Sequence, residues 1–270
     1  MRPKRYLTQL AVATAVAAGF VLALQGVVLA AVVSYSPGTT GNDISYPNCG
    51  ASFPAGSTFG IVGVTGGRAF SKNSCLGSEF TTASGISDAT ALPALYMNLN
   101  APVGPTARQG LTGPAGSCSR KDKACIAYNY GYNAAEAAHN YAQTASASSG
   151  SWWLDIETAN SWSAQPSLNQ DTISGAVYFF YSESLAIGFY STPSQWAAIT
   201  GSSTWSPSYP PPSSPTSTST PTSTPYPVWE AGASQSNPEA ICKGGGFAGA
   251  SPELVQYWSS TTNLDTDYAC

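Results

Sequence analysis

The sequence predicts an α/β fold built on a barrel of mainly parallel strands. Eight short segments rich in β-branched and aromatic residues have the character of strands, and helical segments separate the earlier ones. Continuous apolar runs such as 59–65 suit strands that are covered on both faces. About 240 residues follow an apolar N-terminal segment (270 minus 30), which is close to the usual size of an eight-stranded α/β barrel.

The expected elements alternate along the chain. Strands are expected at 42–46, 59–65, 94–100, 151–158, 185–190, 228–231, 254–259 and 264–269. Helices are expected at 133–144, with Asn133 as N-cap, at 168–184 and at 193–200. The short links between the last three strands leave little room for helices.

The N-terminus reads as an export signal. A basic stretch at 2–5 precedes an apolar run at 10–33, and cleavage after Ala30 is expected. The run is also long enough for an uncleaved signal anchor, so we expect a secreted protein or one held at the cell surface. Residues 31–270 then form a single domain. Within it, 202–227 is a Ser/Thr/Pro-rich insertion, expected to be extended or disordered and to project away from any active site.

Charge and cysteine content limit the classes of binding partner and indicate disulfide bonds. Without residues 1–30, 7 basic residues (10 minus 3) face 14 acidic ones, which argues against nucleic acid and anionic membranes as partners. Six cysteines in an exported chain indicate disulfides; of the 15 possible pairings we expect the sequence-near set Cys49–Cys75, Cys118–Cys125 and Cys242–Cys270. Because there is no Cys-x-x-Cys and His139 is the only histidine, we expect no metal, and no cofactor.

The strand at 151–158 carries the first candidate site residues. Asp155 and Glu157 are two positions apart, so a strand places both on one face with Trp153, and places Trp152 and Leu154 on the other. Catalytic groups of α/β barrels lie at this C-terminal end of the strands. The alternative interpretation is a buried strand whose acids cap the following turn.

Two further stretches bring acids to the same place. Asp43 lies on the first expected strand, and Asp265 (or Asp267) lies on the eighth. First and last strands are neighbours when a barrel closes, so acids from three separate stretches should meet at one mouth.

Several short motifs, in order, resemble glycoside hydrolase family 25, the Chalaropsis-type lysozymes. They are Asn42-Asp43-Ile44-Ser45, Leu154-Asp155-Ile156-Glu157, Gly188-Phe189-Tyr190-Ser191 followed by Trp196, Val228-Trp229-Glu230-Ala231, and Val255-Gln256-Tyr257-Trp258-Ser259 leading to Leu264-Asp265-Thr266-Asp267. The resemblance implies a TIM-like barrel of (β/α)5(β)3 type. The chain departs from the family's pattern at 63–67, which lacks a lysine, and at 96–100.

The resemblance also implies roles. Glu157 would be the general acid, kept protonated by its buried acidic surroundings, while Asp155 would stay ionised and steady the positive centre or orient the 2-acetamido group. Asp43 and Asp265 would position the sugar. The expected substrate contacts are Tyr96, Tyr190, Trp229, Gln256, Tyr257 and Asp267.

The function so implied is a secreted, monomeric glycosidase that cleaves the β-1,4 bond between N-acetylmuramic acid and N-acetylglucosamine in peptidoglycan. The alternative is a catalytically weak or inactive barrel that binds cell-wall glycan. The altered segments at 63–67 and 96–100 favour this alternative.

Overall fold

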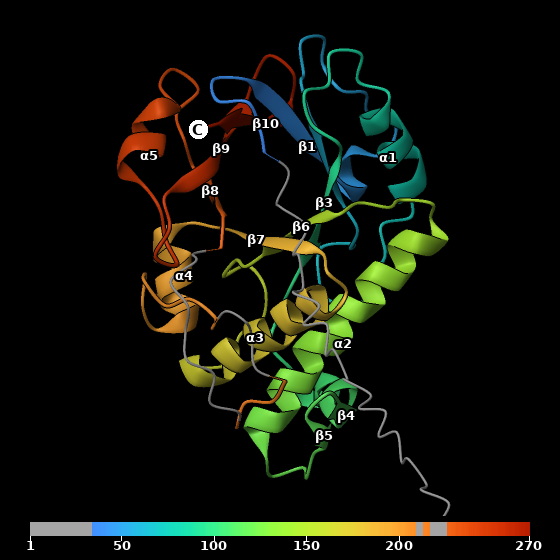
Figure 1. Ribbon diagram of the computed structural model, residues 1–270, viewed down its shortest axis with the longest axis vertical. Helices are drawn as coiled ribbons and strands as arrows, with labels where there is room; N and C mark the ends of the chain where they lie inside the picture. The colour runs from blue at the N-terminus through green and yellow to red at the C-terminus, as the bar shows by residue number, and fades with distance from the viewer. Residues whose placement is uncertain (1–33, 209–212, 217–225) are drawn as a thin grey trace, which may run out of the picture.

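A computed structural model of the protein describes residues 34–208, 213–216 and 226–270. The expected signal segment and half of the insertion lie outside the described residues. The described chain is a mixed α/β fold whose centre is a closed eight-stranded barrel, which confirms the predicted barrel (Figure 1).

The barrel contains a strand in each of the eight expected segments. Its order is β1-β10-β9-β8-β7-β6-β3-β2. The strands are β1 Thr40–Ile44, β2 Gly60–Gly63, β3 Ala94–Asn98, β6 Ser151–Asp155, β7 Ala186–Ser191, β8 Val228–Ala231, β9 Pro252–Ser259 and β10 Leu264–Ala269. Neighbours from β1 through β2 to β9 are parallel. Only β10 is antiparallel, to both β9 and β1.

Helices cover the outside of the barrel. They are α1 Leu76–Ser84, α2 Lys123–Thr144, α3 Pro166–Ser182, α4 Pro193–Thr200 and α5 Glu239–Gly244, and a 3-10 helix, Tyr46–Asn48, follows β1. Figure 1 shows α2 and α3 side by side below the strands and α5 beside β8 and β9. The expectation that the links between the last three strands leave little room for helices was wrong at α5, which lies between β8 and β9. None of the described helices has both the length and the apolar character to cross a bilayer.

The start of α2 also differs from the prediction. The helix begins ten residues before Asn133, and its N-cap is Asp122, whose Oδ1 accepts a hydrogen bond from Cys125 N at 3.0 Å. Asn133 lies in the middle of the helix, where its amide donates to the Thr112 carbonyl at 2.8 Å. A polar side chain that ties a helix to a neighbouring loop looks the same in sequence as an N-cap.

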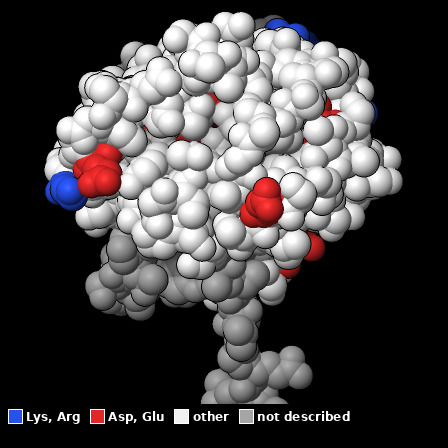
Figure 2. All heavy atoms as spheres, turned by 90° about the horizontal axis from the view of Figure 1, so that it is seen from above, with Lys and Arg blue, Asp and Glu red and all other residues white. Residues whose placement is uncertain are grey.

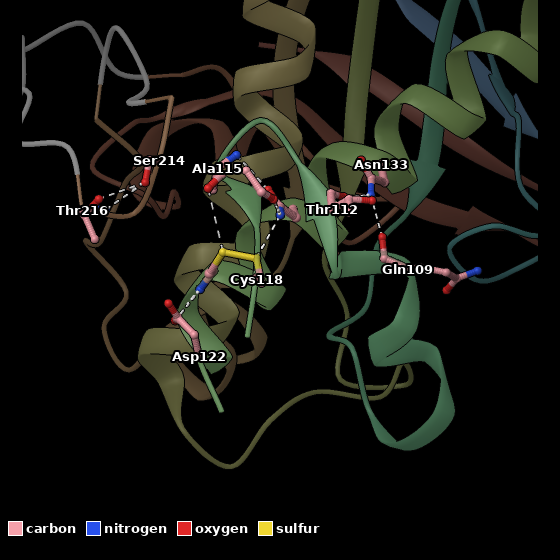
Figure 3. Close-up of a disulfide and its surroundings, with 11 residues drawn as sticks. Gln109, Thr112, Ala115, Cys118, Asp122, Asn133, Ser214 and Thr216 are labelled. Atoms are coloured by element: carbon pink, nitrogen blue, oxygen red, sulfur yellow. Dashed lines mark hydrogen bonds between the residues drawn. A yellow bond between two sulfur atoms is a disulfide. The ribbon is translucent and has the colours of Figure 1, made fainter. Parts of the chain in front are cut away.

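That loop, between β3 and α2, is long and is tied to α2 by a disulfide and hydrogen bonds. It contains a 3-10 helix Gly104–Gly110 and a small hairpin of β4 Thr112–Gly113 and β5 Gly116–Ser117. Figure 3 shows the Cys118 disulfide, made with Cys125, and the bonds that join this hairpin to α2. The other two disulfides are Cys49–Cys75 and Cys242–Cys270, so the expected pairing is confirmed.

The buried apolar side chains form two cores. Trp153 belongs to a smaller cluster inside the barrel, together with Trp229 and Leu254. Trp152 and Leu154 belong to the larger cluster between the barrel and its helices. The alternation predicted for the strand that carries the acids is confirmed, and the interior apolar cluster forms a floor beneath Asp155.

The helices α2 and α3 pack in direct backbone contact. A methyl group at Gly131 of α2 would overlap the Thr172 carbonyl oxygen of α3, and one at Gly175 of α3 would overlap the Tyr128 carbonyl oxygen of α2. Each helix therefore presents a glycine where the backbone of the other approaches most closely.

The expectation that 202–227 is extended or disordered was wrong at the two ends of this segment, which pack against the core. Trp205 packs against Trp196 with ring centroids 5.8 Å apart, and its carbonyl accepts a hydrogen bond from Trp196 Nε1 at 2.9 Å. Tyr226 is buried against Phe189. Aromatic residues at the margins of a low-complexity segment thus belong to the folded domain.

Candidate active site

A cavity of about 320 Å³ opens at the C-terminal ends of the parallel strands. Its walls come from residues at or just after the ends of β1, β2, β3, β6 and β7, and from β8, β9 and β10. They are Asp43, Ser45, Tyr46, Gly67, Tyr96, Asn98, Asp155, Glu157, Ala159, Asn160, Tyr190, Trp229, Gln256 and Asp265. The structure thus brings together eight of the ten predicted site residues.

Four carboxylates converge on this cavity from three stretches of chain. Asp155 is the last residue of β6, and Glu157 follows two positions later on the same side. Asp43 on β1 lies directly opposite Asp265 on β10 in the antiparallel register. Asp43 and Asp155 are buried, whereas Glu157 and Asp265 are half-buried and reach toward solvent.

Two amide side chains hold the buried carboxylates. Gln256 Nε2 donates to Asp43 Oδ1 at 2.8 Å, and Tyr190 Oη donates to Gln256 Oε1 at 2.8 Å. Asn98 Nδ2 donates to Asp155 Oδ2, and Thr65 Oγ1 donates to Asn98 Oδ1 at 2.7 Å. Each amide is oriented by a hydroxyl that bonds its oxygen, so each presents its NH₂ group to a carboxylate.

Burial raises the pKa values of the two buried carboxyl groups. Desolvation, followed by the charge of Asp265, raises the pKa of Asp43 to about 7. Desolvation also raises the pKa of Asp155 well above its usual range, with the charges of Glu157 and Asp43 adding to the effect. The expectation that Asp155 stays ionised is at odds with this environment.

The interior of the protein is unusually acidic. Five of the 14 acidic residues are buried, whereas charged residues make up only 9% of the sequence and are sparse on the face seen in Figure 2. No basic residue lines the cavity. Within the described ranges, no group of three or more His, Cys, Asp or Glu side chains is arranged to hold a metal ion.

Two predicted substrate contacts lie outside the cavity. Tyr257 follows Gln256 on β9 and therefore points to the opposite face of the strand, beside Thr266. Asp267 is fully buried, with its pKa raised well above the usual range by desolvation and by the charge of Asp43. It shares the inward face of β10 with Asp265 but lies one layer deeper, so it does not reach the cavity surface.

The cavity also contains residues that were not predicted. Tyr46, half-exposed in the 3-10 helix after β1, lies over Gly67, and Ser45 and Asn160 complete the rim. Asn98 stands at the end of a strand, as the acids do. Its position at the end of a strand could have identified it as a site residue. It was not predicted because an amide, unlike a carboxylate, does not by itself indicate acid chemistry.

The buried acids predict an inverted pH dependence of stability. Because the pKa values of Asp43, Asp155 and Asp267 are raised in the folded protein, it binds more protons than the unfolded chain above about pH 4. The free energy of unfolding should therefore fall, by about 1–4 kcal/mol, as pH rises from 4 through 7. Urea unfolding at a series of pH values measures this.

Asp267→Asn provides the control, since an amide cannot ionise. The variant should lose less stability than wild type between pH 5 and pH 8. Stability that rises with pH in the wild-type protein would contradict the electrostatic account.

Comparison with known proteins found one family match. Over residues 123–210 the chain matches a protein-family model described as lysozyme-like protein 1. The matched segment runs from α2 to the beginning of the insertion and contains Asp155, Glu157 and Tyr190, but neither Asp43 nor Asp265. It is similar to a lysozyme-like family in general and not to glycoside hydrolase family 25 in particular. No curated protein matches the chain. No solved structure matches it.

Proposed function

We propose that this protein is a secreted glycoside hydrolase that cleaves the β-1,4 bond between N-acetylmuramic acid and N-acetylglucosamine in peptidoglycan. The observation that carries the proposal is the cavity in which Asp43, Asp155, Glu157 and Asp265 meet. The lysozyme-like match over the strand with Asp155 and Glu157 supports it. The proposal includes membership of family 25, a barrel of (β/α)5(β)3 type and a monomeric state. Three disulfides suit an extracellular location.

Cleavage of a glycosidic bond needs a proton for the leaving oxygen and negative charge near the oxocarbenium-like centre. Glu157 is half-buried at the rim of the cavity, where it can reach the oxygen between two sugar rings, so we assign it as general acid. We assign the negative charge to Asp155, which lies deeper. The hydrogen bond from Asn98 favours its ionised form against the effect of burial, and the carboxylate would face the developing positive charge or the 2-acetamido group.

The remaining residues would position the sugar ring. Gln256 fixes Asp43, and Tyr190 fixes Gln256, so a hydroxyl bonded by Asp43 would have a defined place. Tyr190 packs edge-on against Trp229 with centroids 4.5 Å apart, and Tyr96 packs edge-on against the same indole with centroids 6.2 Å apart. These rings form a rigid wall against which one face of a sugar can rest.

The proposal is tested by the new chain ends that the protein creates. Residues 31–270 with disulfides formed are incubated with purified peptidoglycan, and the products are analysed by mass spectrometry. We expect new reducing ends on N-acetylmuramic acid. Reducing ends on N-acetylglucosamine would contradict the bond assigned, and the absence of any new end would contradict hydrolysis.

A second candidate is a barrel that binds cell-wall glycan without cutting it. The loss of the lysine at 63–67 favours it, because the cavity then contains acids but no cation. Sedimentation with peptidoglycan in the absence of new reducing ends would identify this function.

A further inference from the structure

Trp258 is the one exposed tryptophan of this protein. Its side chain is 55% exposed, whereas Trp162 and Trp205 are half-buried and the other four of the seven tryptophans are buried. Exposing an indole to water is unfavourable, and tryptophan is enriched among the residues that carry most of the binding energy at interfaces. It does not belong to the cavity wall, so the site described above gives it no role.

The strand register places Trp258 beside the acids. In the antiparallel pairs, Trp258 of β9 lies opposite Asp265 of β10, and Asp265 lies opposite Asp43 of β1. Residues directly opposite one another in an antiparallel pair project from the same face. Since Asp43 and Asp265 line the cavity, Trp258 stands on the same side of the barrel wall, about two strand spacings, or ~10 Å, from Asp43.

The backbone holds Trp258 in place. It lies in the last ladder positions before the turn to β10, where Asn263 N donates to the Ser259 carbonyl at 2.9 Å. Two residues earlier on the same face, Gln256 is fixed by its bonds to Asp43 and Tyr190. A ring on such a paired strand is presented to solvent without a large cost in backbone entropy on binding.

The chemistry of an exposed indole beside carboxylates suits a sugar. A pyranose ring has an apolar C–H face that can stack on an aromatic ring while its equatorial hydroxyls remain in water or bond to acids. Asp265 is half-buried next to Trp258 and could accept hydrogen bonds from such hydroxyls. A chain of linked sugar rings can span the ~10 Å between Trp258 and Asp43.

We propose that Trp258 is a binding platform for a further sugar ring of the same glycan chain, outside the cavity and on the side of β9 and β10. This inference rests on the proposed function and specifies its substrate as a glycan longer than a disaccharide. Trp258 would then act in binding and not in the chemical step.

The test compares Trp258→Ala and Trp258→Phe with wild type. The matched control is Leu92→Ala, because Leu92 is 79% exposed but precedes β3, at the opposite end of the barrel. Affinity for purified disaccharide and octasaccharide fragments of peptidoglycan glycan is measured by calorimetry, with each variant placed in a Glu157→Gln background to prevent turnover. Cleavage of the octasaccharide is measured separately in the native background.

We expect Trp258→Ala to weaken octasaccharide binding about tenfold, the scale of one aromatic stacking contact, and to leave disaccharide binding within twofold. Trp258→Phe should retain most of the affinity, and Leu92→Ala all of it. In the native background, KM should rise with kcat unchanged. Tryptophan fluorescence should shift to the blue with octasaccharide only when Trp258 is present.

Different failures separate the two proposals. Equal octasaccharide affinity with and without the Trp258→Ala change in the Glu157→Gln background, with cleavage intact in the native background, would overturn the platform alone. Wild type that neither binds nor cleaves the glycan would overturn the proposed function, and the platform with it. Concentration-dependent self-association that Trp258→Ala abolishes would show that a second copy covers the indole, which also overturns the platform.

Discussion

Replacing Glu157 with glutamine should lower the rate of peptidoglycan hydrolysis by about 10²–10⁴-fold, the usual contribution of a general acid. The amide keeps the size and hydrogen-bonding capacity of the side chain but carries no transferable proton. Because Glu157 is half-buried and follows the end of β6, the fold should be unchanged. Release of reducing ends from peptidoglycan measures the loss, and thermal unfolding checks the fold.

Glu136→Gln is the matched control, since Glu136 is an exposed glutamate on α2. It should retain full activity. Full activity in Glu157→Gln would show that the general acid is another member of the cluster. Unfolding of that variant would show that the side chain serves the structure.

The second large effect is expected where α2 and α3 meet. Gly175→Ala places a methyl group onto the Tyr128 carbonyl oxygen, so the helices must separate. We expect the free energy of unfolding to fall by about 2 kcal/mol, even though alanine favours a helix over glycine by about 1 kcal/mol. Chemical denaturation at constant pH measures this.

Gly150→Ala is the comparison variant, because no atom lies within 4 Å of the added methyl group. Its stability should stay within about 0.5 kcal/mol of wild type. An unchanged midpoint for Gly175→Ala would mean that the two helices are not held in backbone contact.

Local sequence patterns were sufficient for much of the fold. The period-2 alternation around Trp153 placed Asp155 and Glu157 on the inward face, and the structure confirms that face for the strand. The disulfide pairing could be predicted because each cysteine has a partner nearby in the sequence. In each case, short-range chemistry decides the outcome.

Depth and long-range contacts were not predictable in this way. Asp265 and Asp267 are the same residue type and lie two positions apart on one face of β10, yet Asp265 lines the cavity and Asp267 lies beneath it. The face of Tyr257 depends on the register of β9, and alternation alone does not reveal which set of residues points inward. The bond from Gln256 to Asp43 joins residues 213 positions apart, so no local pattern signals it.

The pairing of β1 with β10 determines when this cavity can exist. Asp43 belongs to the first strand of the barrel and Asp265 to the eighth along the chain, so the cavity is complete only after the whole barrel has been synthesised and closed. Contacts between segments so far apart in sequence form slowly, because the entropy of the intervening chain must be lost first. A nascent or truncated chain without β10 would lack one side of the acid cluster. The four carboxylates can therefore come together only after β10 has joined the barrel.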